Sequence, residues 1–228
     1  MKTSYFSFKK LEVRLGDVLV SNFEGWSGLD IFKFSLPKEK KFSSSQLNNF
    51  KPELINKEKI FFTYEGGIEL KSEEFKFVLK KLDAIDFRNE QNYEFKSLKE
   101  TSIFMISSKV SKQINEKSIA FNFEKDLEKR DLWGGKIISK PYEGKELTLV
   151  LFELKDGFEF NDKGHSNEQI TWLVNGKMNF YSDNKKKLLN SDLGVSIGSG
   201  HLHGGISKGA IGFDAFFPKR VEKKYKNV

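Results

Sequence analysis

The 228-residue sequence contains no cysteine, only 4 prolines and only 3 histidines. Without cysteine the chain forms no disulfide and offers no thiolate to a metal, which fits a reducing compartment. No apolar run approaches the roughly 20 residues that cross a bilayer as a helix. The first residues also lack the apolar stretch and cleavage site of a secretory signal. These absences predict a cytoplasmic protein without a membrane partner.

The charge balance is basic. Lysine and arginine total 39 against 32 acidic residues, which gives a net charge of +7. Nucleic-acid binding needs such cations clustered in a patch or stripe. Most lysines here are scattered in pairs, such as Lys9-Lys10 and Lys80-Lys81, and the one longer run, 185–187, follows the turn-like string Ser-Asp-Asn. We therefore expect an ordinary solvated surface and no nucleic-acid partner.

Short strands dominate the predicted secondary structure. Apolar and polar residues alternate over residues 30–36, 74–79 and 212–217, and turns rich in Gly, Asn-Asp or Lys separate such segments. Many short strands joined by such turns are typical of a sandwich or barrel. The 23 phenylalanines supply enough apolar volume for a core. Short helices are expected only at 45–50 and 123–130.

The chain also contains an internal repeat. FEGWSGLDIFKFSL, from Phe23, resembles YEGKELTLVLFEL, from Tyr142. In the same order, KIFFTYEGGIEL, from Lys59, resembles QITWLVNGKMNF, from Gln169. The repeat length is far longer than that of a solenoid, so we infer two copies of one barrel-sized unit.

All three histidines lie in the second copy. His165 stands in GHSNEQITWLVNG, and His201 and His203 stand in IGSGHLHGG. These strings resemble the two metal-ligand motifs of the cupins, G-x5-H-x-H-x3/4-E-x6-G and P-x-G-x2-H. The resemblance places His165, Gln169 and His203 at ligand positions. Lys163 stands where the first histidine of the motif belongs.

Cupins are small double-stranded β-helix (jelly-roll) barrels, so the resemblance implies an all-β chain with two tandem barrels, a bicupin. The expected domains are a degenerate N-terminal cupin barrel over 1–110, a connection over 111–130 and a C-terminal barrel with the site over 131–228. In the first copy the corresponding positions hold Glu53, Ile55, Lys59 and Tyr93, a set that does not bind a transition metal.

The ligand set leaves three alternatives open. Two imidazoles and an amide oxygen suit a divalent ion such as Zn²⁺, Ni²⁺, Mn²⁺ or Fe²⁺, and water or His201 would complete the set of His165, Gln169 and His203. Alternatively, the protonated ammonium of Lys163 repels a cation and replaces the metal's charge. In the third alternative, the histidines are a satisfied polar pair in a vestigial pocket.

Two further strings resemble a particular group of cupins. NEQITWLVNG and FDAFFPKR are similar to segments of the small cupin enzymes of pectin and alginate breakdown, which open the ring of 4,5-unsaturated monouronates. The resemblance implies that Asp214, Phe216 and Arg220 line an active site. Asp214 would move a proton, and Arg220 would clamp a substrate carboxylate. Lys163 would assist catalysis and contact the substrate, and His201 would meet it at the rim.

The expected function is therefore a metal-assisted enzyme that opens or isomerises a small sugar acid or related carbohydrate-derived substrate, with the metal as a Lewis acid. Two other functions fit the same residues: a non-catalytic sugar- or metabolite-binding bicupin without metal, and a metal-dependent dioxygenase. In each case the partner is a small molecule, anionic or sugar-like. Two barrels in one chain can mimic a cupin dimer, so the chain is expected to be a monomer or a homodimer.

Overall fold

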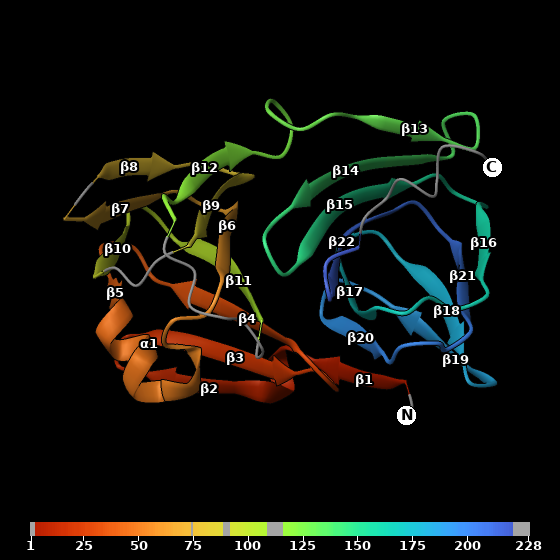
Figure 1. The fold of residues 1–228 in the computed structure, drawn as a ribbon, viewed down its shortest axis with the longest axis horizontal. Coiled ribbons are helices and arrows are strands. Elements are labelled where there is room, and N and C mark those ends of the chain that lie inside the picture. The colour runs from red at the N-terminus through yellow and green to blue at the C-terminus, as the bar shows by residue number, and fades with distance from the viewer. Residues whose placement is uncertain (1–2, 74, 89–91, 109–115, 221–228) are drawn as a thin grey trace. The chain divides into compact units, whose positions relative to one another are not determined.

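β-Strands form nearly all of the regular structure in the computed structural model, which describes residues 3–73, 75–88, 92–108 and 116–220 (Figure 1). The predicted all-β class with two tandem barrels is confirmed. Backbone contacts divide the chain into two compact units. We call them the N-terminal barrel (Phe8–Glu24 and Asp30–Asp126) and the C-terminal barrel (Met1–Ser7, Gly25–Leu29 and Leu127–Val228).

Each barrel consists of a seven-stranded and a four-stranded antiparallel sheet. In the N-terminal barrel the strand order is β12-β9-β6-β11-β4-β3-β2 in one sheet and β5-β10-β7-β8 in the other. The strands are β2 (Glu12–Leu15), β3 (Val18–Glu24), β4 (Leu29–Leu36), β5 (Lys41–Ser43), β6 (Lys59–Glu65), β7 (Ile68–Ser72), β8 (Lys76–Leu79), β9 (Asp83–Phe87), β10 (Tyr93–Ser97), β11 (Thr101–Ser108) and β12 (Ile119–Asn122).

The C-terminal barrel repeats this topology strand for strand. Its sheets have the orders β1-β20-β17-β22-β15-β14-β13 and β16-β21-β18-β19. The predicted repeat is thus confirmed at the level of topology. The strands are β1 (Ser4–Ser7), β13 (Arg130–Leu132), β14 (Ile137–Glu143), β15 (Thr148–Leu154), β16 (Glu159–Asp162), β17 (Glu168–Asn175), β18 (Met178–Ser182), β19 (Lys185–Leu189), β20 (Leu193–Ile197), β21 (His203–Ser207) and β22 (Ala210–Phe217).

The two copies exchange their first strands. β1 precedes the N-terminal barrel in sequence but pairs with β20 of the C-terminal barrel, and β12 precedes the C-terminal barrel but pairs with β9 of the N-terminal one. Strand pairing satisfies the backbone groups of each exchanged strand within the barrel that receives it. The division into barrels therefore does not follow a single cut in the chain.

Residues 25–29 also belong to the C-terminal barrel, although they connect β3 to β4. The buried carboxylate of Glu168 accepts hydrogen bonds from the backbone N–H groups of four consecutive residues, Trp26, Ser27, Gly28 and Leu29, and from the Ser27 hydroxyl. A buried charge is tolerated only when it is hydrogen-bonded in this way. Glu168 thus fixes the segment to β17, on the face opposite to Gln169.

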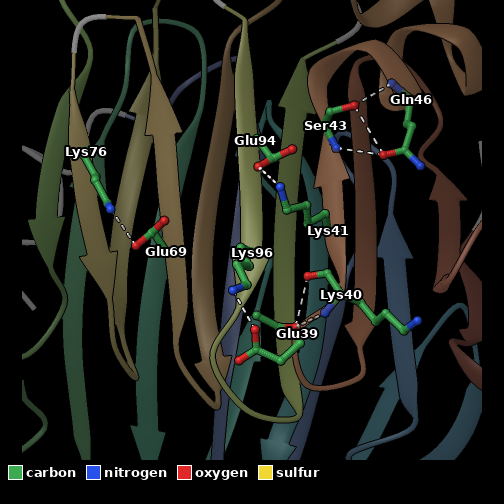
Figure 2. Close-up of polar contacts among 10 residues, drawn as sticks. Glu39, Lys40, Lys41, Ser43, Gln46, Glu69, Lys76, Glu94 and Lys96 are labelled. Atoms are coloured by element: carbon green, nitrogen blue, oxygen red, sulfur yellow. Dashed lines mark hydrogen bonds and ion pairs between the residues drawn. The ribbon is translucent and has the colours of Figure 1, made fainter.

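The short helix expected at 45–50 is confirmed as α1 (Ser44–Phe50). Ser43 and Gln46 form a capping box at its N-terminus (Figure 2). The helix expected at 123–130 is wrong. There Asn122 Oδ1 accepts from the N–H groups of Glu124 and Lys125, and the segment forms this Asx turn with one backbone bond from Asp126 N–H to the Asn122 carbonyl. Two single-turn 3₁₀ helices, η1 (Lys9–Leu11) and η2 (Pro52–Leu54), complete the described elements.

Aromatic side chains fill the interior of the N-terminal barrel. Phe61 lies at its centre, with ring centroids 5.0 Å from Phe95, 5.6 Å from Phe87 and 5.6 Å from Tyr93. Tyr93 and Lys59 occupy the positions that His203 and Gln169 hold in the other barrel, and both are buried. The same fold therefore encloses a packed aromatic core in one copy.

The outer face of the sheet β5-β10-β7-β8 carries pairs of opposite charge (Figure 2). Lys41 lies 2.9 Å from Glu94, and Lys76 lies 2.9 Å from Glu69 on the neighbouring strand. Exposed pairs like these contribute at most about 1 kcal/mol each.

Among the described residues, no helix is long and apolar enough to cross a membrane.

Candidate metal centre

The loop between β16 and β17 positions the candidate centre. Gly164 has φ 93°, which favours glycine, and a Cβ there would come within 2.7 Å of the Gly200 carbonyl oxygen. In return the Gly200 N–H donates to the His165 carbonyl, with N and O 2.7 Å apart. The loop is therefore clamped against the turn that leads into β21. This contact brings His165 next to His203.

Three side chains converge at this point. Asp162, His165 and His203 each present a potential ligand atom, and these atoms all lie within 4.8 Å of one another. Asp162 and His203 are cross-strand partners in β16 and β21. The Oε1 atom of Gln169 lies 2.9 Å from the Nε2 atom of His165. The structure thus brings the predicted residues His165, Gln169 and His203 together and adds Asp162.

Hydrogen bonding orients one imidazole and burial keeps the other neutral. His203 Nδ1 lies 3.0 Å from the His201 carbonyl oxygen, which leaves its Nε2 atom for the centre. Burial, and secondarily the positive charge of Arg220, lower the pKa of His165. The Nδ1 atom of His165 is buried and has no hydrogen-bond partner among the described residues. A neutral imidazole is the form that coordinates a metal.

A hydrogen-bonded carboxylate lies beside the histidines. The Oδ1 atom of Asp214, on β22, accepts from the Thr171 hydroxyl at 2.5 Å and from the Gln169 amide at 3.0 Å. Burial raises the pKa of Asp214, while these two hydrogen bonds oppose the rise. A carboxyl whose pKa is raised by burial can exchange a proton with a substrate.

Arg220 brings a cation to the same place. Its guanidinium lies 3.7 Å from the Asp162 carboxylate and 4.8 Å from the centroid of the Phe216 ring. Phe216 is 4% exposed and its ring is 5.6 Å from that of His165. Phe216 is therefore a packing surface for both groups.

Apart from His165, which lies behind the wall, these groups line one cavity of about 1340 Å³ inside the C-terminal barrel. The predicted residues in its wall are Lys163, Gln169, His203, Asp214, Phe216 and Arg220. Lys163 is exposed, while its neighbour Asp162 approaches the histidines. His201 faces away from them, because its Nδ1 atom lies 3.1 Å from the Asp183 carboxylate.

Sequence reasoning missed Asp162, Thr171 and Trp133. The motif spacing put Lys163 in the ligand position because it assumed a strand running through His165. The chain leaves β16 at Asp162 instead. Gly164 was the available signal, since a glycine two residues after a strand indicates a turn. Trp133 lines the far end of the cavity, and no sequence motif marks it.

The fold defined by these two barrels is the cupin fold. Neither a family model nor a curated protein matches the sequence. Solved structures do match over nearly the whole chain, at low identity, so the likeness shows the fold alone.

Three of them illustrate the match. A cupin 2 conserved barrel domain protein from Leptotrichia buccalis is 16% identical with a TM-score of 0.66, covering 96% of this chain and 98% of its own. The protein Ylba from E. coli is 12% identical with a TM-score of 0.75 over 97% and 93%. Oxalate decarboxylase from Bacillus subtilis, a protein with Mn(II) centres, is 8% identical with a TM-score of 0.70 over 94% and 77%.

Proposed function

We propose that the C-terminal barrel is a metal-assisted enzyme site for a small, oxygen-rich carboxylic acid. The observation that carries this proposal is the convergence of ligand atoms of Asp162, His165 and His203 within 4.8 Å of one another, beside a large cavity whose wall includes Asp162 and His203. Sugar acids, including the unsaturated uronates, are the substrate class that the strings around Gln169 and Asp214 favour. The Mn(II) centres of the oxalate decarboxylase of the same fold support a first-row metal.

The donor set fits such an ion. Two imidazole nitrogens, a carboxylate and the Gln169 amide oxygen match the preferences of Mn²⁺, Fe²⁺, Ni²⁺ and Zn²⁺. The pKa of His165 is lowered, so the imidazole is available in its neutral form. When bound, the metal would supply Lewis-acid polarisation of a substrate oxygen.

The chain's own residues have separate roles in this proposal. Arg220 binds the substrate carboxylate, because a guanidinium pairs with a carboxylate through two parallel hydrogen bonds. Asp214 gives or takes a proton at its carboxyl oxygen, since burial raises its pKa. Thr171 and Gln169 hold that carboxyl in place through their hydrogen bonds to Oδ1.

The decisive measurement is the metal content of the purified full-length chain, by elemental analysis before and after loading with Mn²⁺, Fe²⁺, Ni²⁺ or Zn²⁺. We expect about one equivalent per chain in the wild type, and a loss of at least tenfold in affinity in His165→Ala and His203→Ala. His201→Ala is the matched control, because that imidazole faces Asp183. A wild type that stays metal-free after loading contradicts the proposal.

One contact favours a second candidate, a metal-free barrel that binds an anion. Arg220 already lies 3.7 Å from Asp162, and its charge compensates the carboxylate without an ion. In that case Asp162→Asn frees the guanidinium and strengthens binding of a uronate such as galacturonate. If the metal proposal holds, Asp162→Asn instead weakens metal binding. Calorimetric titration of this variant with the metal and with galacturonate separates the two functions.

A further inference from the structure

The cavity continues well beyond the candidate centre. Its wall runs along the inner face of β15 and β14 to the edge strand β13, and it ends at residues 128–133. The seven-stranded sheet outnumbers the facing sheet by three strands, so its last strands extend past the four-stranded one. The part of the cavity over β13 and β14 is used by none of the groups assigned above.

Trp133 is the outstanding side chain of this outer part. It lines the cavity, yet it is 48% exposed, and its ring centroid lies 5.9 Å from that of Phe158. Its backbone has φ 52°, which is rare for a bulky residue. Gly134 and Gly135 follow with φ 65° and 78°. The hairpin between β13 and β14 thus holds an indole at the solvent end of the cavity at a conformational cost.

The wall between Trp133 and the polar centre is apolar. Phe152, Leu154, Phe158, Met178 and Phe180 form it and belong to one hydrophobic cluster. Next to Trp133, the cavity is lined by two cations, Lys129 and Arg130, and two anions, Glu128 and Asp131. The cavity therefore has a cationic, hydrogen-bonding end at Arg220 and an aromatic end at Trp133, with an apolar passage between them.

We propose that the outer part of the cavity is a second subsite, which binds the flat apolar or aromatic portion of an extended carboxylic acid by stacking on Trp133. The assignment of the carboxylate to the Arg220 end rests on the function proposed above. The evidence for the subsite itself is the position of Trp133 at the cavity wall. An exposed indole at a cavity wall offers a large apolar face that stacks on a planar ring.

The size of the cavity supports an extended ligand. Ligand sites usually measure about 300–1,000 Å³, and this cavity measures about 1340 Å³. A two-carbon acid or a single sugar acid at the centre leaves the passage and the Trp133 end filled only by water. An acid that carries a ring several bonds from its carboxylate covers both ends.

Three probes test the subsite by calorimetric titration: phenyl β-D-glucuronide carries ring and acid, glucuronate carries only the acid, and phenyl β-D-glucoside carries only the ring. In the wild type we expect phenyl glucuronide to bind most tightly. Trp133→Ala should weaken it by about tenfold and leave glucuronate unchanged, since a stacked aromatic pair and its buried area are worth about that factor. Trp133→Phe should recover most of the loss.

Trp26→Ala is the matched control, because that indole is also exposed, at 45%, and does not line the cavity. Equal affinity of Trp133→Ala and wild type for phenyl glucuronide, or no binding to the wild type, overturns the subsite. His203→Ala separates this result from the metal proposal. If the subsite exists and the enzyme proposal fails, the ratio of the affinities for phenyl glucuronide and glucuronate should be the same in His203→Ala as in the wild type.

Discussion

The Thr171 hydroxyl donates a hydrogen bond of 2.5 Å to the Oδ1 atom of Asp214, its cross-strand partner on β22. Gln169, two residues earlier on the same face of β17, donates to the same atom. Both donors favour the ionised carboxylate, whereas burial favours the protonated one. The protonation of Asp214 is therefore set by a balance that a single substitution can shift.

Thr171→Val should raise the pKa of Asp214 further, because it removes one donor to the ionised form. Burial already raises the pKa of Asp214 in the folded protein. The contribution of this carboxyl to folding stability is therefore fully present below the ordinary pKa of 3.8. It is lost as pH rises from the ordinary value of 3.8 through the folded-state pKa. The variant should extend this loss to higher pH. Carbon-13 titration of the aspartate carboxyls in protein dialysed against chelator measures the shift.

Thr171→Ser is the control for that experiment, since serine keeps the hydroxyl. It should titrate as the wild type does. If valine and serine give the same titration curve, the hydrogen bond between residues 171 and 214 does not control the carboxyl.

Glu168→Ala should destabilise the C-terminal barrel by roughly 2–4 kcal/mol. The four backbone N–H groups that now donate to the Glu168 carboxylate would lose their hydrogen-bond acceptor. Glu168→Gln keeps one acceptor oxygen and should cost less, about 1–2 kcal/mol. Urea denaturation followed by tryptophan fluorescence measures both losses.

Ser27→Ala provides the matched comparison, because it removes only the hydroxyl bond to Glu168 and leaves the backbone bonds intact. It should cost at most about 1 kcal/mol. A loss in Ser27→Ala as large as that in Glu168→Ala would mean that the backbone bonds contribute little.

Gly176 and Gly209 have similar backbone angles, but substitution by alanine should reduce the stability of the protein by different amounts at the two positions. Gly176 has φ 75°, and a Cβ there would lie 1.7 Å from the Gly209 carbonyl oxygen. Gly209 itself has φ 69° with no atom within 4 Å of its Cβ position. Gly209→Ala should cost only the strain of the left-handed conformation, about 1–2 kcal/mol.

Gly176→Ala should cost that strain plus about 1–3 kcal/mol for overpacking, since the backbone it meets must move. Thermal unfolding of the two variants, compared with the wild type, gives the difference directly. Equal melting temperatures for the two variants would show that the turns at 176 and 209 relax freely.

The sequence was informative where side chains alternate regularly. The strand pattern, the two copies and the face occupied by Gln169 follow from the two-residue period of a strand. Trp172, whose side chain alternates with that of the pocket-lining Thr171, is fully buried and stacks on Phe213 with ring centroids 5.5 Å apart. These features depend on local periodicity, which a single sequence contains.

Loops limited the prediction of the site. Asp162 joins the histidines because the chain turns at Gly164 and docks on Gly200, a contact between segments far apart in sequence. Trp133 lines the cavity because three successive residues adopt positive φ. Neither contact follows from alternation, so the motif spacing indicated Lys163 and gave no sign of its neighbour Asp162.

The exchange of β1 has a consequence for how the protein is made on the ribosome. Ser7, at the end of β1, hydrogen-bonds to Asp192, 185 residues later in the chain. During synthesis, β1 therefore emerges long before its partner strand and stays unpaired while the N-terminal barrel assembles around later residues. An unpaired strand edge is a template for wrong pairing. Nascent chains halted before β20 should consequently depend more on chaperones than chains released complete.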